Sequence, residues 1–208
     1  MKKIDYTAFL KWENKLKKKD VLLDIGCWTG INTARFNKKC DAWGMDIDRD
    51  KLNSANPNIK NNLKYGDVTQ KIPFTQKFDY CILSEVLEHL DNDQQALDNI
   101  NQCLKYKGKL ILTTPRQINY LEFWDPAWIR WKLGIGGKHR HYSIEDLNRL
   151  LSQNGFKIET YAIGFGLDFI LTRWANIFLK HILQSKKIIK GKVKNGYFDL
   201  CIIAKKIK

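Results

Sequence analysis

The sequence lacks the features that mark secreted, membrane-spanning and zinc-binding proteins. Its five cysteines are odd in number and widely scattered, with no C-x-x-C pair, which argues against a disulfide framework and against a zinc site. The lysines at the start are followed by no apolar segment of the kind that a secretory signal needs. No run approaches the roughly 18 uncharged apolar residues of a membrane-spanning helix. We therefore expect a cytoplasmic protein in a reducing compartment.

The sequence also lacks internal repeats, low-complexity tracts and linkers, so we expect residues 1–208 to form a single domain. Its 44% hydrophobic and 12% aromatic residues are those of a folded globular protein. The formal net charge of +14 favours contact with a polyanion, whether nucleic acid, anionic lipid or a phosphorylated substrate. A surplus of lysine also serves solubility alone, so the charge does not by itself identify a partner.

Short apolar runs alternate with helical patterns from residue 21 onward. Apolar runs separated by helices are typical of a parallel sheet that helices cover on both faces. The pattern predicts strands at Val21–Ile25, Ala42–Met45, Leu63–Tyr65, Tyr80–Ser84, Leu110–Thr114, Phe156–Ala162 and Tyr197–Ala204.

Capping residues mark the ends of the predicted helices. The segment Asp93–Leu104 has an apolar helical face, and we expect Lys107-Gly108 to end that helix. Ser143 is predicted to cap a later helix that Gly155 closes. Between the last two strands, residues 164–195 are expected to form an amphipathic and basic insertion.

Three predicted strands end in glycine or aspartate. The first runs into Asp24-Ile25-Gly26-Cys27-Trp28-Thr29-Gly30 before a helix, and glycines there let the backbone approach a ligand at the helix N-terminus. Gly44-Met45-Asp46 ends the second strand 20 residues after Gly26, a spacing at which an acid accepts hydrogen bonds from ribose hydroxyls. Gly66-Asp67 ends the third, where a carboxylate can accept from an adenine amine. The set predicts a nucleotide-type cofactor, the alternative being that these acids cap helices.

The loop after the first strand does not fit a nicotinamide enzyme. The dinucleotide fingerprint is G-x-G-x-x-G, and here Trp28 stands at its second glycine and Ile31 at its third. The pyrophosphate needs close backbone approach where Trp28 lies, so hydride transfer is disfavoured.

These segments together resemble the motifs of class I S-adenosylmethionine-dependent methyltransferases. Val21–Gly30 is similar to their first motif, and Phe78–Leu90 to the fourth-strand region of the branch with a Val-Leu-Glu-His segment. The resemblance implies a Rossmann-like, doubly wound α/β sheet of seven strands, the last antiparallel, with helices on both faces. It implies S-adenosyl-L-methionine as cofactor, bound at the carboxyl ends of the first four strands. By position, the residues expected around the cofactor are Asp24, Gly26, Cys27, Trp28, Gly30, Asp46, Ile47, Asp67, Val68 and Ser84.

Trp28 departs from the glycine usual in this family. Its backbone N–H is retained, so we expect its ring either to point away from the cofactor or to wall the pocket. The resemblance further places Asp24 at the amino-acid end of the cofactor, Asp46 at the ribose, Asp67 at the adenine and Ser84 near the sulfonium.

The segment Glu85-Val86-Leu87-Glu88-His89 follows the fourth of these strands. As the start of a helix it would place Glu85, Glu88 and His89 on one face, where they could ligate a divalent ion. It resembles the metal-binding segment of ubiquinone-pathway O-methyltransferases and of small-RNA 2′-O-methyltransferases. Acids in a first helical turn are also favourable without a metal, so we assign no metal ligand here.

Two histidines precede the helix capped by Ser143. Since the loop after the fifth strand commonly faces the substrate in this family, His139 and His141 are the candidate general bases. His141 is the nearer to the helix start. The alternative is that one is exposed and the other packs near the cap.

Two apolar segments have no assigned place. The aromatic residues of Tyr120–Trp131 predict either a substrate lid or a small satellite core. Residues 167–194 combine an apolar helical stripe with trailing lysines, which suits peripheral contact with an anionic membrane, packing on the domain or a second subunit. Nucleic acid is a weaker candidate partner because no recognisable binding motif accompanies the lysines.

The sequence thus predicts methyl transfer from S-adenosylmethionine, and O-methylation of a small-molecule or lipid-like acceptor in particular. The alternatives are a metal-assisted RNA 2′-O-methyltransferase, and a non-catalytic module of the same fold that binds a membrane or a partner.

Overall fold

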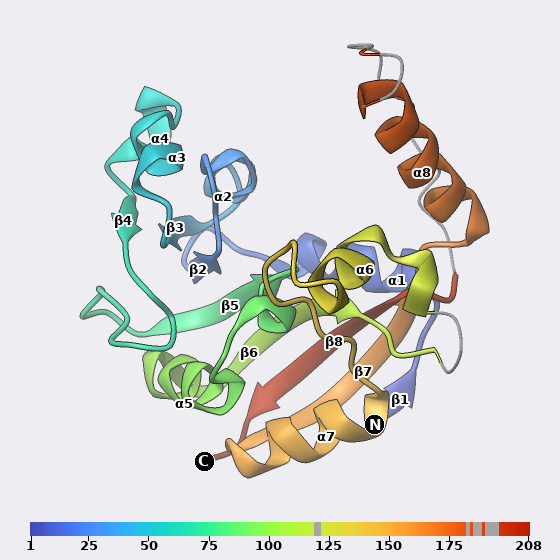
Figure 1. Cartoon of the computed structure of the whole chain (residues 1–208). Coiled ribbons are helices and arrows are strands. Elements are labelled where there is room, and N and C mark those ends of the chain that lie inside the picture. Colours follow the sequence, from blue (N-terminus) through green and yellow to red (C-terminus); the bar gives the residue numbers. More distant parts are fainter. Residues whose placement is uncertain (119–121, 182–183, 185–188, 190–195) are drawn as a thin grey trace.

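The computed structural model describes residues 1–118, 122–181, 184, 189 and 196–208, and its strands form one eight-stranded sheet (Figure 1). The strand order is β1-β7-β8-β6-β5-β2-β3-β4. The strands are β1 (Lys2–Lys3), β2 (Val21–Ile25), β3 (Asp41–Asp46), β4 (Leu63–Tyr65), β5 (Phe78–Ser84), β6 (Leu104–Pro115), β7 (Phe156–Gly164) and β8 (Asp199–Lys206).

All neighbouring strands are parallel except β8, which runs antiparallel to both β6 and β7. This order and the antiparallel last strand confirm the expected Rossmann-like class. The sheet has one strand more than expected, because Lys2 and Lys3 pair with Thr160 and Tyr161 of β7. Two exposed lysines carry no apolar pattern from which a strand could be predicted.

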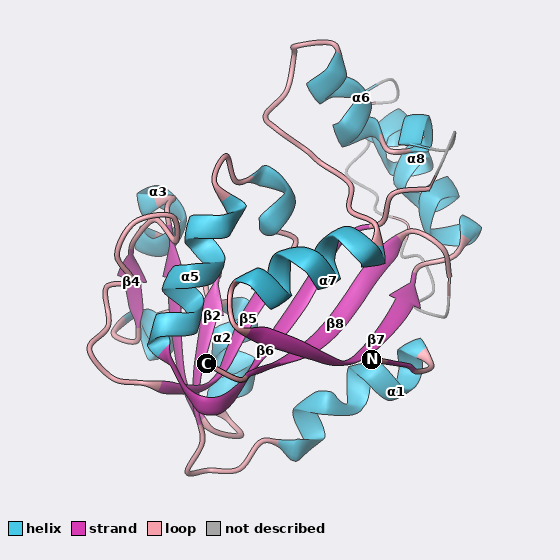
Figure 2. Ribbon diagram, turned by 90° about the horizontal axis from the view of Figure 1, so that it is seen from below, coloured by secondary structure: helices cyan, strands magenta, loops and turns pink. Residues whose placement is uncertain are grey.

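Helices cover both faces of the sheet (Figure 2). One face packs on α5 (Asp93–Cys103) and α7 (Ile144–Gln153), and the opposite face packs on α1 (Tyr6–Leu10) and α2 (Ile31–Asn37). Side chains alternate between the faces along each strand, so that Leu110 and Leu112 belong to the first core and Ile111 to the second. The remaining helical segments are η1 (Lys11–Lys15), α3 (Arg49–Asn53), α4 (Pro57–Lys60), η2 (Leu87–His89), η3 (Glu122–Trp124), α6 (Pro126–Lys132) and α8 (Leu167–His181).

The predicted end of the α5 helix was wrong by several residues. The helix ends at Cys103, and Lys107-Gly108 lies inside β6, where the pairing with β5 jumps from Phe78↔Leu104 to Tyr80↔Lys109. Lys107 takes a left-handed φ of 65° there. Glycine and a neighbouring lysine indicate a turn in both cases, so the sequence alone does not separate a helix end from a strand bulge.

The connection from β7 to β8 carries α8, which stands away from the sheet beyond the ends of its strands (Figure 1). The helix forms the first part of the predicted amphipathic and basic segment 167–194, of which 182–183, 185–188 and 190–194 lie outside the described residues. None of the helices formed by the described residues has the length and apolar content to cross a bilayer.

Candidate active site

The carboxyl ends of β2, β3, β4 and β5 meet at one edge of the sheet. Register places Ile25 beside Met45 and Leu83, so Gly26, Asp46 and Ser84 follow at neighbouring strand ends. The backbone N–H groups of Gly26 and Cys27 both donate to the carbonyl of Met45, at 2.9 and 3.1 Å. The sheet therefore brings the residues predicted around the cofactor to one place.

The first loop contains two glycines in left-handed backbone conformation. Gly26 has φ 76°, and a Cβ added to it would lie 2.4 Å from Cγ2 of Val86. Gly30 has φ 73° and comes directly before α2, where an added Cβ would lie 2.7 Å from Leu63. Both positions favour glycine, and they leave the backbone open to a ligand in front of a helix N-terminus.

Trp28 lies in the same loop, between Gly26 and Gly30. It too is left-handed, with φ 54°, and its ring is 55% exposed beside Nζ of Lys51, 5.2 Å from the ring centroid. Its backbone N–H donates to Oδ2 of Asp46 over 2.7 Å. The backbone of Trp28 is thus linked to Asp46, while its ring lies at the surface.

The other residues predicted around the cofactor differ in the chemical groups that they can offer to a ligand. The carboxylate of Asp46 also accepts from the N–H of Asp48, and it is Asp48 that caps α3. Ile47 is exposed, whereas the side chain of Val68 is buried in the core, so Val68 can offer a ligand only its backbone. Asp67 accepts from the N–H and the hydroxyl of Thr69, and so also stabilises the turn that follows.

Two buried side chains lie behind the first loop. Cys27 is buried, and its Sγ would lie 2.8 Å from a Cβ at Gly44, so the two residues pack together. Asp24 is buried and accepts a 2.7 Å hydrogen bond from the hydroxyl of Thr33. Burial raises the pKa of Asp24 from 3.8 to about 6, against the opposing effect of the Thr33 hydrogen bond. A positive charge close to Asp24 would therefore stabilise the ionised form of this carboxyl.

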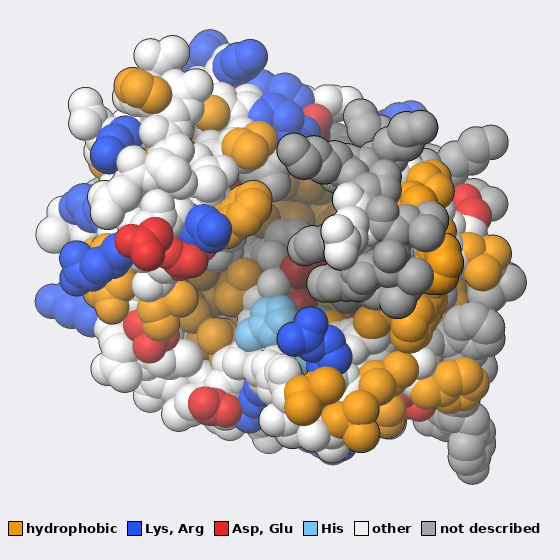
Figure 3. All heavy atoms as spheres, turned by 45° about the horizontal axis from the view of Figure 1, so that its top comes forward, with side chains coloured by type: hydrophobic (Ala, Val, Ile, Leu, Met, Phe, Trp, Pro, Cys, Tyr) orange, Lys and Arg blue, Asp and Glu red, His pale blue; other side chains and the backbone are white. Residues whose placement is uncertain are grey.

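A cavity of about 530 Å³ opens beside Asp24 and Ser84. Space-filling shows a hollow with acidic side chains at its base and a histidine at its rim (Figure 3). Its wall is rich in aromatic rings from α1 and from the ends of β7 and β8. Its lining includes the side chains of Tyr6, Phe9, Trp12, Phe36, Ser84, Glu85, Thr113, Asp125, His141, Phe165, Phe198 and Asp199.

A short chain of polar groups crosses the cavity wall. The hydroxyl of Thr113 donates to Oε1 of Glu85 at 2.8 Å, so the hydroxyl of Ser84, 2.8 Å from that of Thr113, donates to Thr113. Ser84 and Glu85 are therefore fixed in orientation where the sulfonium end of the cofactor is expected.

The segment Glu85–His89 does not form the helix start that was predicted. Glu85 is left-handed with φ 54°, and only Leu87–His89 make a single 3-10 turn. As a result Glu88 is fully buried and Glu85 faces the cavity. The proposed shared helical face of Glu85, Glu88 and His89 is therefore wrong.

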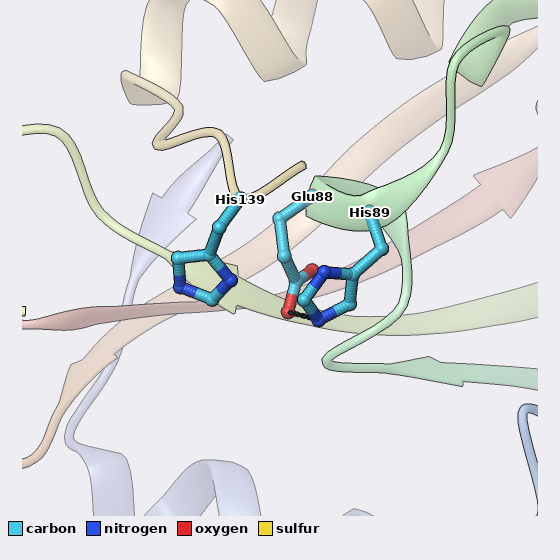
Figure 4. Close-up of side chains that lie close together, drawn as sticks. All are labelled: Glu88, His89 and His139. Carbon is cyan, nitrogen blue, oxygen red and sulfur yellow. Dashed lines mark ion pairs between the residues drawn. The ribbon is translucent and has the colours of Figure 1, made fainter. Parts of the chain in front are cut away.

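The fold instead joins Glu88 and His89 to His139 (Figure 4). One potential ligand atom from each lies within 4.8 Å of the others, and Nε2 of His89 is 3.7 Å from Oε1 of Glu88. Among the described residues, Oε1 of Glu88 and Nδ1 of His139 are buried without a hydrogen-bond partner. Burial, together with the charge of Glu85, raises the pKa of Glu88 to about 9. A carboxyl and two imidazoles so placed fit a divalent cation.

The two candidate histidines have different surroundings. His141 lines the cavity and stacks on Trp128, with ring centroids 6.2 Å apart. His139 is buried and lies with Glu88 and His89. Both bond to the same carboxylate oxygen of Asp125, a buried residue that no sequence motif marked as part of the site. The dipeptide Asp125-Pro126 signals a helix cap, but not a partner 14 to 16 residues further along.

The aromatic segment is described only in part, since 120 and 121 lie outside the described residues. From Glu122 onward it forms η3 and α6, and Glu122 lines the cavity. Trp128 and Trp131 are half-buried, and Lys132 lies over both rings. The segment thus packs at the cavity rim, a place compatible with either a lid or a satellite core.

Comparisons with known proteins identify the family of this chain. A family model described as a methyltransferase domain matches residues 3–161. The chain is 33% identical over 103 residues to the mitochondrial ubiquinone biosynthesis O-methyltransferase of Candida albicans, covering 45% of this chain and 32% of that protein. It is 26% identical over 156 residues to the O-methyltransferase cnsE of Penicillium expansum, covering 66% of this chain and 52% of that protein. The chain thus spans about a third to a half of the length of these relatives.

Solved structures share the fold at low identity. An S-adenosylmethionine-dependent methyltransferase of Methanosarcina mazei superposes with a TM-score of 0.64 at 19% identity, over 93% of this chain and 95% of that one. The [4+2]-cyclase SpnF superposes with a TM-score of 0.63 at 16% identity, over 97% of this chain and 79% of that one. Because a cyclase shares the architecture, the fold alone does not assign the reaction.

Proposed function

Because the chain belongs to the S-adenosylmethionine-dependent methyltransferases, we propose that it transfers the methyl group to a hydroxyl oxygen of a small, largely apolar acceptor. The observation that carries the proposal is the meeting of the Gly26, Asp46 and Ser84 strand ends with an aromatic-walled cavity. The O-methyltransferases among the relatives support oxygen as the atom that is methylated.

The residues at the strand ends suit the cofactor's functional groups. Asp46, oriented by the Trp28 N–H, would accept from the ribose hydroxyls, and Asp67 would accept from the adenine amine. Asp24 would face the amino-acid end, where a positive charge stabilises its ionised form. When bound, S-adenosylmethionine supplies a methyl group on a positively charged sulfur, and Glu85 places negative charge nearby.

The acceptor would occupy the cavity among Tyr6, Phe9 and Phe165. Methyl transfer is an in-line displacement, so alignment of the oxygen with the methyl group is the main task of these walls. The new O–C bond forms as the S–C bond breaks, and the hydroxyl proton must leave. We assign its acceptance to His141, because this histidine and not His139 lines the cavity.

Glu88, His89 and His139 would hold a divalent cation beside this cavity. Such a cation supplies positive charge that polarises a hydroxyl oxygen. The carbonyl of Lys138 lies 2.7 Å from Nδ1 of His89, so this nitrogen donates and Nε2 is left to face the cation. This geometry also motivates RNA 2′-O-methylation as a second candidate, because a ribose hydroxyl is polarised in the same way.

The test is calorimetric titration with S-adenosylmethionine and S-adenosylhomocysteine, comparing the wild type with Asp46→Ala. We expect micromolar binding that Asp46→Ala abolishes and that Asp50→Ala, an exposed carboxylate four residues later, leaves intact. Failure of the wild type to bind either ligand would overturn the proposal and favour a non-catalytic module.

Acceptor class is then tested with radiolabelled methyl donor. Catechols with and without an alkyl tail, and a small RNA with a free 2′-hydroxyl, are offered in parallel with Mg²⁺ or Mn²⁺. Labelling of a catechol supports the proposal. Labelling of the RNA alone would replace it with the second candidate.

A further inference from the structure

Asp125 is a buried carboxylate that contacts three different parts of the site. Its Oδ1 accepts from the N–H of Ala127 at 3.0 Å and caps α6. Its Oδ2 lies 2.8 Å from Nε2 of His139 and 3.0 Å from Nε2 of His141. Both imidazoles are themselves almost fully buried, with side chains 6% exposed. One oxygen atom therefore serves both histidines.

This arrangement determines the tautomer of both rings. An ionised carboxylate only accepts hydrogen bonds, so each Nε2 must carry the hydrogen. A neutral imidazole with Nε2–H presents a lone pair at Nδ1. Over the described part of the chain, Nδ1 of His139 and Nδ1 of His141 are buried and have no hydrogen-bond partner. Neither Nδ1 lone pair is therefore used by another group in the described part of the chain.

The two imidazoles lie in different parts of the site. One ring nitrogen of His139 is turned toward Glu88 and His89 (Figure 4), and since Nε2 bonds to Asp125, this nitrogen is Nδ1. The imidazole of His141 belongs to the cavity wall. A rotation of either ring about its Cβ–Cγ bond would break the bond to Asp125 and remove Nδ1 from its position.

We propose that Asp125 is the positioning residue of this site, which holds His139 and His141 in the Nε2–H tautomer. It thereby assigns Nδ1 of His139 to the cation pocket, and leaves Nδ1 as the unprotonated nitrogen of His141, whose imidazole lines the acceptor cavity. The inference rests on the proposed function for the identity of the two ligands. Asp125 also accepts from the N–H of Ala127, so the start of α6 and the two imidazoles share one carboxylate.

The experiment reads the tautomers directly. Long-range ¹H–¹⁵N correlation spectra of ¹⁵N-histidine-labelled protein at pH 8, where an ordinary imidazole is neutral, distinguish Nδ1–H from Nε2–H. We expect His139 and His141 of the wild type to be Nε2–H. Asp125→Asn can still cap α6 through its oxygen, but its NH₂ group would face the imidazoles and can only donate. At least one histidine should then change to Nδ1–H.

Two further variants separate positioning from capping. Asp125→Ser retains a good helix cap but is too short to reach either imidazole, so it should lose the uniform Nε2–H pattern while α6 is retained. Asp5→Asn alters another aspartate cap, which accepts from the N–H of Thr7 at 2.8 Å in α1, and should change neither histidine.

Binding of Mn²⁺, followed by electron paramagnetic resonance, gives a second readout. We expect Asp125→Asn to weaken it by about 10- to 100-fold, the usual effect of removing a partner of a ligating histidine. An Nδ1–H tautomer in the wild type, or unchanged tautomers and Mn²⁺ affinity in Asp125→Asn, would overturn the inference. If Mn²⁺ does not bind the wild type, the cation pocket is overturned, while the spectra still decide the role of Asp125.

Discussion

The backbone N–H of Trp28 donates to Oδ2 of Asp46 over 2.7 Å, which links the first glycine-rich loop to the end of the next strand. The bond uses only the main chain of Trp28, so the side chain at this position is free to differ from the glycine usual in the family. The cost is a tryptophan in left-handed conformation, with φ 54°.

Trp28→Gly should therefore stabilise the protein. A non-glycine residue in left-handed conformation is disfavoured by about 1–2 kcal/mol, part of which is offset by the greater backbone freedom of glycine in the unfolded chain. We expect the free energy of unfolding to rise by about 1 kcal/mol and Tm by about 2–4 °C, with cofactor affinity within a few-fold of wild type. Thermal denaturation and calorimetry measure both. A lower Tm would show that the contact between the ring and Lys51 outweighs the backbone strain.

Gly26→Ala should lose both stability and cofactor binding, because its Cβ would lie 2.4 Å from Cγ2 of Val86. The matched control is Gly134→Ala, which has a similar φ of 71° but no atom within 4 Å of the added Cβ. Gly134→Ala should lose about 1–2 kcal/mol, from backbone strain alone. Gly26→Ala should lose more free energy of unfolding than Gly134→Ala, as measured by urea denaturation. This difference should become smaller when Val86 is also replaced by alanine. Equal losses at both glycines would contradict the clash.

Asp24→Asn should change how stability depends on pH. The pKa of Asp24 is raised by burial from 3.8 to about 6, so the folded chain binds this proton more tightly than the unfolded chain does. The stabilising contribution is therefore present below pH 4, falls between pH 4 and 6, and is absent above pH 6. The shift corresponds to about 3 kcal/mol.

We accordingly expect Asp24→Asn to exceed the wild type in free energy of unfolding at pH 7.5 by up to about 3 kcal/mol, and not at pH 4. An asparagine oxygen can still accept from Thr33, while cofactor affinity should fall because the negative charge is gone. Urea titrations across pH 4–8 measure the effect, with the exposed Asp41→Asn as control. A constant difference across this range would contradict the assignment.

The two histidines should separate in function. His139→Asn should weaken Mn²⁺ binding by more than tenfold, since it removes one of three ligands. His141→Asn should leave Mn²⁺ affinity within a few-fold but lower kcat by about 100-fold or more, because it removes the proton acceptor. Both variants should keep cofactor affinity. An equal loss of Mn²⁺ affinity in both variants would contradict separate roles for the two histidines.

The exposed stripe on α8 should bind anionic lipid, which we propose as its role. Leu171, Trp174 and Phe178 are 61%, 38% and 52% exposed, and five lysines follow in the sequence between 186 and 194. We expect co-sedimentation with phosphatidylserine vesicles, weaker with phosphatidylcholine alone, and reduced on the order of tenfold by Trp174→Ser. Tyr106→Ser, which removes an exposed aromatic ring from β6, is the control. Equal loss in both variants would contradict a role for α8.

The sequence predicted those parts of the fold that local pattern determines. Apolar runs located the central strands because those strands are buried on both faces, and β2 has the predicted bounds. The glycines of the first loop predicted a tight turn after β2, and Gly26 and Gly30 both take left-handed conformation there. The family resemblance supplied the antiparallel last strand.

The features of the fold and the site that the sequence did not predict depend on contacts between residues distant in the chain. The left-handed Glu85 breaks the expected helix and turns Glu88 inward, and a helical pattern in the letters cannot show this. His139 joins Glu88 and His89 across some 50 residues of chain, and Asp125 joins His139 from another element. Likewise, β1 forms by pairing with β7, a strand distant in the sequence.

Strand order has a consequence for how the chain folds. β8 lies between β6 and β7, although β7 precedes it in the chain. Until β8 enters, β6 has an unpaired side, and β7 with its neighbour β1 has no hydrogen-bonded connection to the rest of the sheet. Pairing over such a sequence separation is slow, because loop closure comes before any contact is gained. We therefore expect β2 to β6 to assemble first and the β7 side to join last, which leaves open sheet edges exposed to aggregation during that interval.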